Sequence, residues 1–175
     1  MAIGNAAFDL GKSIASGDNS TAFGNTSKAV GTESFAIGNN TIASGAQSFA
    51  GGGQSAEASG QYSFAFGNGA KAIGNHAVAM GVGTVAPARS SVTIGRFNVN
   101  TFTSTNITEN SPGDPIFQVG AGADALRRFN IITTFLGTNG TTGAGAGWMA
   151  IGGEENTMPE RSTNNERLRV YGGVL

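Results

Sequence analysis

The sequence predicts an all-β chain whose first half is a solenoid of short strands. Three observations predict it. Glycine recurs every seventh residue through much of the first 95 residues, as at Gly38, Gly45 and Gly52. Each glycine closes a unit of the form S/T-x-A-x-G, in which residue types alternate with the period of a strand. Turn-forming pairs such as Asn39-Asn40 separate the units, and short strands joined by such corners at a fixed period make a solenoid.

The interior of this roll is predicted to be narrow. The Ser, Ala and Gly positions of a unit share one face of the strand, because side chains alternate between faces. Nothing larger than these residues recurs there, and glycine at the strand end permits a backbone conformation that other residues resist. The residues assigned to the interior and its turns are Gly24, Gly38, Gly52, Gly67, Gly81, Ala22, Ala36, Ala50, Ala65 and Ala79.

The other two positions of each unit face outward, and they differ between alternate units. One series is apolar at every position except Thr21 and Gly51. The other series is mixed and carries Lys28, Glu57 and Lys71, which are candidates for surface contacts. The structural period is therefore fourteen residues, so that each coil has two strands, one apolar outer face and one polar outer face.

The apolar outer face is predicted to be the surface on which copies of the chain associate. An exposed apolar stripe promotes aggregation of a monomer, and closed symmetry buries it. Burial of each large side chain contributes about 1.5–3 kcal/mol, so we expect an obligate oligomer without a stable folded monomer. The predicted interface residues are Phe8, Leu10, Phe23, Phe35, Ile37, Phe49, Phe64, Phe66, Val78, Met80, Val92 and Ile94.

The repeat has a family resemblance. The stretch NSTAFGNTSKAVGTESFAIGNNTIASGAQSFA resembles the head repeats of YadA-type trimeric autotransporter adhesins, which also occur in trimeric fibre proteins of bacteriophages. The resemblance covers about residues 1–95. It implies a left-handed parallel β-roll of fourteen-residue coils, and three such rolls packed side by side as a homotrimer.

The repeat stops after residue 95, and two further regions are expected. Residues 96–115 are polar and turn-rich, which is typical of a linker or a cap of the roll. Residues 116–175 are expected to form a smaller β-rich trimeric module that resembles one found after such rolls in phage and adhesin fibres. The matching residues are Phe117, Val119, Gly120, Gly122, Arg127, Asn130 and Gly137. The segment 164–175 resembles one that joins phage fibre shafts to a C-terminal domain, sometimes a removable chaperone, which we expect to have followed Leu175.

Several kinds of chemistry are not expected. A net charge of −1 offers no basic surface for nucleic acid, the longest apolar runs are too short to insert in a membrane, and no cysteine is present for disulfides or zinc. The Gly-Lys-Ser that begins at Gly11 follows Gly4 by six intervening residues instead of the four of a phosphate-binding loop. His76 is the single histidine and has no predicted carboxylate or nucleophile beside it. We therefore predict no enzyme, no cofactor and no metal site.

Three groups in the second half remain open at this level. Arg127 and Arg128 either pair with acids across subunits or lie in solvent. Trp148 is either a core residue or an exposed contact. Glu154, Glu155 and Glu160 form either a solvated loop or a metal or salt-bridge site. Each alternative is typical of its residue types, and the pattern does not choose between them.

The favoured function is a structural and attachment fibre on a virion surface, either a tail or a head fibre. The chain shows no secretion signal, heptad stalk or anchor strands, and on that ground we expect a bacteriophage virion fibre. Its partners would be further copies of itself, a host cell-surface glycan or protein receptor, and other virion proteins. The alternative is a head fragment of a bacterial adhesin at a cell surface that binds host cells or matrix. Ice binding and cleavage of surface sugars are weaker hypotheses, since the outer positions are irregular and paired carboxylates are lacking.

Overall fold

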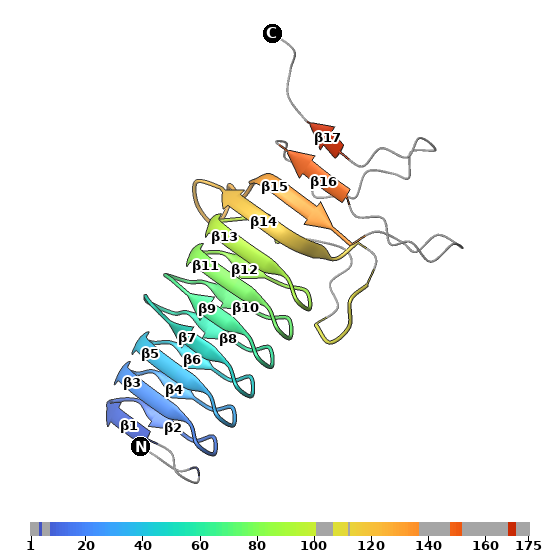
Figure 1. Cartoon of the computed structure of the whole chain (residues 1–175). Coiled ribbons are helices and arrows are strands. Elements are labelled where there is room, and N and C mark those ends of the chain that lie inside the picture. Colours follow the sequence, from blue (N-terminus) through green and yellow to red (C-terminus); the bar gives the residue numbers. More distant parts are fainter. Residues whose placement is uncertain are drawn as a thin grey trace.

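A computed structural model describes most of the chain and shows an all-β fold. The described residues are 4, 8–100, 107–111, 113–136, 148–151 and 168–170. They form two sheets, one of eleven strands and one of six, and Figure 1 shows the coils stacked along one direction. The predicted β-solenoid is confirmed, with about six turns.

Each coil of the roll contributes one strand to each sheet. In the first sheet the roll strands are β1 (Phe8–Gly11), β3 (Thr21–Asn25), β5 (Phe35–Asn39), β7 (Phe49–Gly51), β9 (Phe64–Phe66), β11 (Val78–Val82) and β13 (Val92–Arg96). In the second sheet they are β2 (Ile14–Ala15), β4 (Lys28–Ala29), β6 (Ile42–Ala43), β8 (Glu57–Ala58), β10 (Lys71–Ala72) and β12 (Val85–Ala86). All neighbouring strands within the roll are parallel, as successive turns of a solenoid must be.

The register of the strands repeats every fourteen residues with two exceptions, the first being the step of thirteen residues from Phe8 to Thr21. Thr21 lies opposite Phe35, and Phe35 lies opposite Phe49, whereas Phe49 lies opposite Phe64, fifteen residues on. The extra residue is accommodated at the end of β7, where Gly52 takes a φ of 73°. The insertion therefore leaves the alternation of inward and outward side chains unchanged in the following strand.

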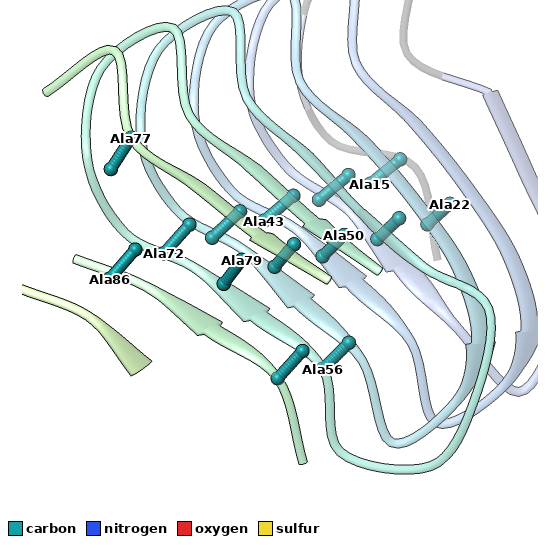
Figure 2. Close-up of a cluster of buried hydrophobic side chains, with 14 residues drawn as sticks. Ala15, Ala22, Ala43, Ala50, Ala56, Ala72, Ala77, Ala79 and Ala86 are labelled. Carbon is teal, nitrogen blue, oxygen red and sulfur yellow. The ribbon is translucent and has the colours of Figure 1, made fainter. Parts of the chain in front are cut away.

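The core of the roll is built from alanine. Fourteen alanines form one buried cluster with no exposed surface, and Figure 2 shows their methyl groups lining the narrow space between the two sheets. The space is narrow because successive coils also meet through backbone. A Cβ atom added to Gly45 would lie 2.0 Å from the carbonyl oxygen of Gly60. Only glycine fits at that position.

The corners that lead from the second sheet to the first carry side chains in an unusual backbone conformation. Glu33, Gln47, Tyr62 and His76 all have φ between 55° and 60°, a region that costs residues with a Cβ about 1–2 kcal/mol. Each of their amides donates a hydrogen bond to a backbone carbonyl in the preceding coil, as from Tyr62 to Ala46 at 2.9 Å. These bonds offset the cost and align the corners as a ladder.

The first sheet continues beyond the roll, whereas the second ends at β12. The added strands are β14 (Pro115–Ala121), β15 (Asn130–Phe135), β16 (Trp148–Ile151) and β17 (Leu168–Val170). Strand β14 is parallel to β13 and in register with it, so that Gly95 lies opposite Gly120. Strands β15 and β16 are antiparallel to their predecessors, and β17 is parallel to β16. Figure 1 shows β14 and β15 beside the last coil.

A buried side-chain amide closes the open edge of the second sheet. The amide of Val85 donates to Oδ1 of Asn98 at 2.7 Å, and Nδ2 of Asn98 donates to the carbonyl of Val85 at 2.9 Å. In the coil before, the amide of Lys71 donates to the carbonyl of Thr84, thirteen residues on. Asn98 also follows Val85 by thirteen residues, so its side chain replaces the backbone that a further coil would supply.

Two more buried amides complete this cap. Nε2 of Gln118 donates to the carbonyl of Val99 at 3.0 Å, and Oε1 of Gln118 accepts from Nδ2 of Asn98 at 3.1 Å. Oδ1 of Asn130 accepts from the amide of Val99 at 3.0 Å. Because buried polar groups need partners, these three side chains fix the path of the chain as it leaves the roll.

Candidate functional site

The candidate functional site is the outer face of the first sheet, where two rows of side chains run across the strands. The register places the first row at Phe8, Thr21, Phe35, Phe49, Phe64, Val78 and Val92. It places the second row at Leu10, Phe23, Ile37, Gly51, Phe66, Met80 and Ile94. The side chain of Leu10 lies outside the described part. We call these two rows the apolar face.

The apolar face is open to solvent in the single chain. Phe8, Phe23 and Phe66 are 54%, 45% and 43% exposed. Within the first row the phenylalanine rings stack from coil to coil, with ring centroids 5.4 Å apart for Phe35 and Phe49 and 4.8 Å apart for Phe49 and Phe64. Stacked aromatic pairs at this spacing stabilise each other, so the rings of the first row support one another from coil to coil.

One interruption that the sequence suggested is filled in the structure. Gly51 leaves a gap in the second row, and the inserted Gly52 follows it. A Cβ atom on Gly52 would lie 2.4 Å from the ring of Phe66, which shows that this ring lies over the glycine. The apolar face is therefore continuous across the fifteen-residue coil.

The residues predicted for the interior and its turns lie as follows. Ala22, Ala36, Ala50, Ala65 and Ala79 have no exposed surface. The predicted turn glycines all have positive φ, namely Gly24 at 121°, Gly38 at 138°, Gly52 at 73°, Gly67 at 127° and Gly81 at 125°. At four of these five positions the backbone of the next coil approaches as well, as at Gly81, where an added Cβ would lie 1.8 Å from the carbonyl oxygen of Gly95.

The predicted surface contacts lie on the outer face of the second sheet. Nζ of Lys71 and Oε2 of Glu57 form an ion pair at 2.9 Å between adjacent coils, with their side chains 49% and 36% exposed. Lys28 lies on β4 and is exposed. An exposed pair of this kind contributes little to stability, so these charges are not required for the fold. They share the outer face of the second sheet with exposed apolar side chains such as Ile14 and Val30.

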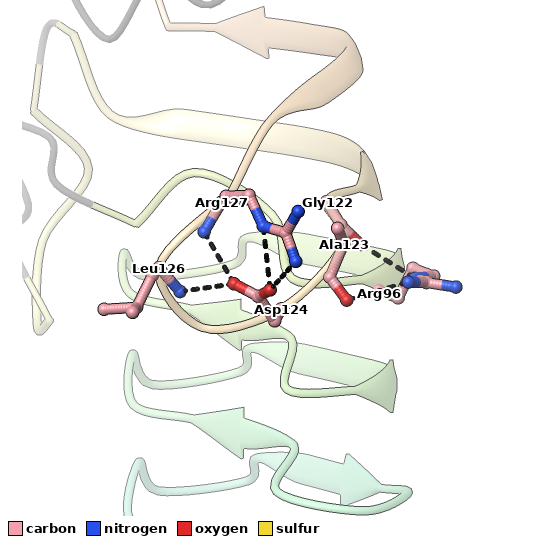
Figure 3. A network of polar contacts seen from close by, with 6 residues as sticks. All are labelled: Arg96, Gly122, Ala123, Asp124, Leu126 and Arg127. Atoms are coloured by element: carbon pink, nitrogen blue, oxygen red, sulfur yellow. Dashed lines mark hydrogen bonds and ion pairs between the residues drawn. The ribbon is translucent and has the colours of Figure 1, made fainter.

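The loop after β14 shows where the two arginines lie within the single chain. Arg127 pairs with Asp124 of its own chain, and Oδ1 of Asp124 also accepts from the amides of Leu126 and Arg127 at 3.0 and 2.9 Å. These hydrogen bonds, the Arg127 side chain first among them, lower the pKa of Asp124. The loop is anchored by Arg96, which donates to the carbonyls of Gly122 and Ala123. Figure 3 shows this network and the side chain of Leu126 extending away from it.

Arg128 instead joins the second region to the roll. Its Nη1 donates to the carbonyl of Gly83 at 2.9 Å and to that of Asn98 at 3.1 Å. Its guanidinium lies 5.6 Å from the centre of the Phe97 ring, and partial burial lowers its pKa. The matching residues of the sequence resemblance include Arg127, which is exposed, whereas Arg128 makes the contact with the roll.

The described residues hold no cluster of side chains typical of metal binding. No group of three or more His, Cys, Asp or Glu side chains is close enough to hold a metal ion among them. His76 stacks on Tyr62 with ring centroids 4.9 Å apart. In the same part of the chain, no helix is long and apolar enough to cross a membrane. Gly137, the Trp148 side chain, Glu154, Glu155 and Glu160 lie outside the described residues.

Comparison with known proteins gives one match. The family described as YadA head domain repeat (2 copies) matches residues 15–41, 29–55, 53–70, 58–84 and 72–97. No curated protein and no solved structure matched the chain. The family is a structural, adhesin-type family and not an enzyme family, and YadA-type heads in general form homotrimers on surface-exposed adhesins. Residues 15–97, which include most of the roll, match the YadA-type head repeat.

Proposed function

We propose that the chain is a segment of a homotrimeric, non-enzymatic fibre that projects from a surface and attaches to a host. The apolar face supports this proposal, since it presents two ordered rows of large side chains to solvent. Such a face on a soluble chain marks a site of association. Burial of each large side chain contributes about 1.5–3 kcal/mol, so the face supplies a strong drive for assembly.

The association is tested by the native mass and by two matched variants. Sedimentation equilibrium at several concentrations is expected to give about three times the chain mass of 17.5 kDa. Phe23→Asp places a charge in the apolar face and is expected to lower the mass toward that of one chain. Val30→Asp is the control, because Val30 is similarly exposed, 48% against 45%, but follows β4 of the second sheet. It is expected to leave the assembled mass unchanged.

A folded single chain of 17.5 kDa that stays monodisperse on dilution would contradict the proposal. Equal effects of the two aspartate variants would also contradict it, because the assembly would then not depend on the apolar face.

The rod is proposed to stand on a bacteriophage virion. About six coils at a strand spacing of about 4.8 Å give a rod of about 30 Å. The resemblance of residues 164–175 to segments of phage fibres favours a virion over the alternative, a bacterial adhesin head. Immunogold labelling of purified virions with an antibody against the roll tests this choice, and labelling restricted to bacterial cell surfaces would favour the alternative.

Attachment is proposed to use the polar face of the second sheet, which stays outside when the apolar face is buried. Among the described residues of this face, Lys28 is exposed and forms no ion pair, whereas Lys71 is paired with Glu57. We expect Lys28→Glu to weaken binding to host cells while the native mass stays that of the unmodified protein. If the Lys28→Glu variant and virions that lack the protein both bind host cells normally, the attachment role is contradicted. The protein would then be a structural fibre without an adhesive role.

A further inference from the structure

The apolar face does not end where the repeat ends. Val92 lies opposite Phe117, and Ile94 lies opposite Val119, so β14 continues both rows. Strand β15 continues them with Thr134 and Ile132, and β16 with Met149 and Ile151. Except for Thr134 every one of these side chains is apolar, although no S/T-x-A-x-G unit is present here.

Two β-bulges add further apolar side chains to this region. The register between β14 and β15 shifts once between Pro115 and Phe117 and once between Val119 and Gly120. The first shift leaves Ile116 as the extra residue, and the second leaves Ile131. Bulges re-aim side chains at the edge of regular pairing.

The side on which the two extra isoleucines lie follows from the burial of their neighbours. Ile131 precedes Ile132 between the buried, inward residues Asn130 and Thr133. Ile116 precedes Phe117 between Pro115 and Gln118, which are also buried. Both isoleucines therefore lie on the outer side, where Ile116 is 39% exposed and Ile131 is 46% exposed.

We propose that the outer face of β14, β15 and β16 is part of the same interface between copies of this chain as the apolar face of the roll. The inference rests on the proposed homotrimer and extends it beyond the repeat. A copy that covers Val92 and Ile94 on β13 has reached within one strand spacing, about 4.8 Å, of Phe117 and Val119. Both rows continue from β13 to β14 in register, and the side chains remain apolar. In the proposed homotrimer a second copy lies over the adjoining strand, so the occupant of this face is that second copy.

The absence of cysteine from the sequence allows a direct test of what is covered. Single cysteines are introduced in the full chain as Ser44→Cys, Met80→Cys and Ile131→Cys, and the rate of alkylation of each native protein is measured. Ser44 is exposed directly after β6 of the second sheet, Met80 is 42% exposed on the apolar face, and Ile131 is 46% exposed beyond the roll. We expect the thiols at positions 80 and 131 to react at least about tenfold more slowly than that at position 44, because thiol reactivity follows exposure.

The three rates separate this inference from the function on which it rests. Slow alkylation at position 80 with fast alkylation at position 131 overturns the inference and leaves the trimeric roll intact. Fast alkylation at position 80, in a protein with the mass of one chain, overturns the proposed function. If Ile131→Cys does not fold, Met149→Cys repeats the measurement on β16, where Met149 is 36% exposed.

The identity of the occupant is tested with a benzophenone side chain in place of Phe117. Illumination of the native protein is expected to join two chains, which gives a species of twice the chain mass on a denaturing gel. Peptide mapping of that species is expected to place the new bond on β14, β15 or β16 of the other copy. A bond within one chain alone would show that a segment of the same chain covers the face, and it would overturn the inference.

Discussion

Backbone N–H and C=O groups at the edge of a strand need hydrogen-bond partners. The roll and the region after it supply these partners by different means. Inside the roll, the edge of each coil is paired by the backbone of the next, and side chains have only to be small enough to allow it. At the end of the roll no further coil follows the second sheet, and Asn98 supplies the missing donor and acceptor from one side chain. The roll therefore depends on the absence of large side chains from its interior. The region after it depends on hydrogen bonds from particular side chains.

The largest effect is expected where a coil meets the next through backbone. Gly45→Ala places a Cβ atom 2.0 Å from the carbonyl oxygen of Gly60, and such overpacking costs about 3 kcal/mol or more. Gly69→Ala is the matched change, because Gly69 has a φ of 65° but its nearest neighbour would be 3.8 Å away. It is expected to cost about 1–2 kcal/mol. Denaturant unfolding at one fixed chain concentration measures both, and equal costs would show that close approach does not limit the roll.

A smaller but specific effect is expected at the cap. Asn98→Ala leaves the amide of Val85 without its buried partner, leaves the carbonyl of Val85 with Oγ1 of Thr93 as its one remaining donor, and removes one partner of Gln118. Each buried polar group left unpaired costs about 1–3 kcal/mol, and water that enters the space recovers part of this. We expect a net loss of about 2 kcal/mol in the free energy of unfolding. Asn68→Ala changes an exposed asparagine and is expected to cost less than about 0.5 kcal/mol. Similar losses in the two variants would argue against a structural role for the cap.

The smallest effect is expected in the loop held by Asp124. Its pKa is lowered in the folded chain, so the carboxylate stabilises the loop above the ordinary aspartate range near pH 4, and this contribution is lost as the pH falls through the lowered pKa. Order parameters of the Leu126 and Arg127 amides from NMR are expected to fall in acid. Asp124→Asn is expected to show the lower values at neutral pH already. Because the Asp124 side chain lies at the surface, 41% exposed, the global stability is expected to change little. A rigid loop in the Asn variant would contradict this account.

The difference between the repeating roll and the cap, which is built from single side chains, explains which parts of the structure the sequence could predict. The roll was predictable because its requirement repeats: Ala36 and Ala50 occupy equivalent positions, and so do Thr21 and Phe35. The cap was not predictable in this way, since Asn98, Gln118 and Asn130 each occur once and act through contacts distant in sequence. The one available signal is the position of Asn98, thirteen residues after Val85, where a further coil would place its carbonyl. The residues of the apolar face were placed on one surface by their period, and their burial in an assembly stays a prediction.

The second sequence region shows a further limit of pattern matching. The resemblance of residues 116–175 includes Arg127 among its matching positions, but a match assigns no contact to either of two adjacent arginines. The structure gives the contact with the roll to Arg128 and leaves Arg127 in solvent, paired with Asp124. The two bulges were also hidden, because Ile116 and Ile131 look like ordinary strand residues in the sequence.

Because each coil pairs in a set register with the next, the length of the roll can change only by whole coils. If residues 21–34 were deleted, Phe35 would meet Phe8 in the place of Thr21, and every later pair would be unchanged. The rod would become shorter by about 4.8 Å, while the cap and the strands beyond it would keep their structure. A deletion of seven residues would instead bring a strand of the second sheet against one of the first and would exchange the apolar and polar faces. Fibres of this kind can therefore be lengthened or shortened in their genes by whole coils, in steps of fourteen codons, without redesign of either end.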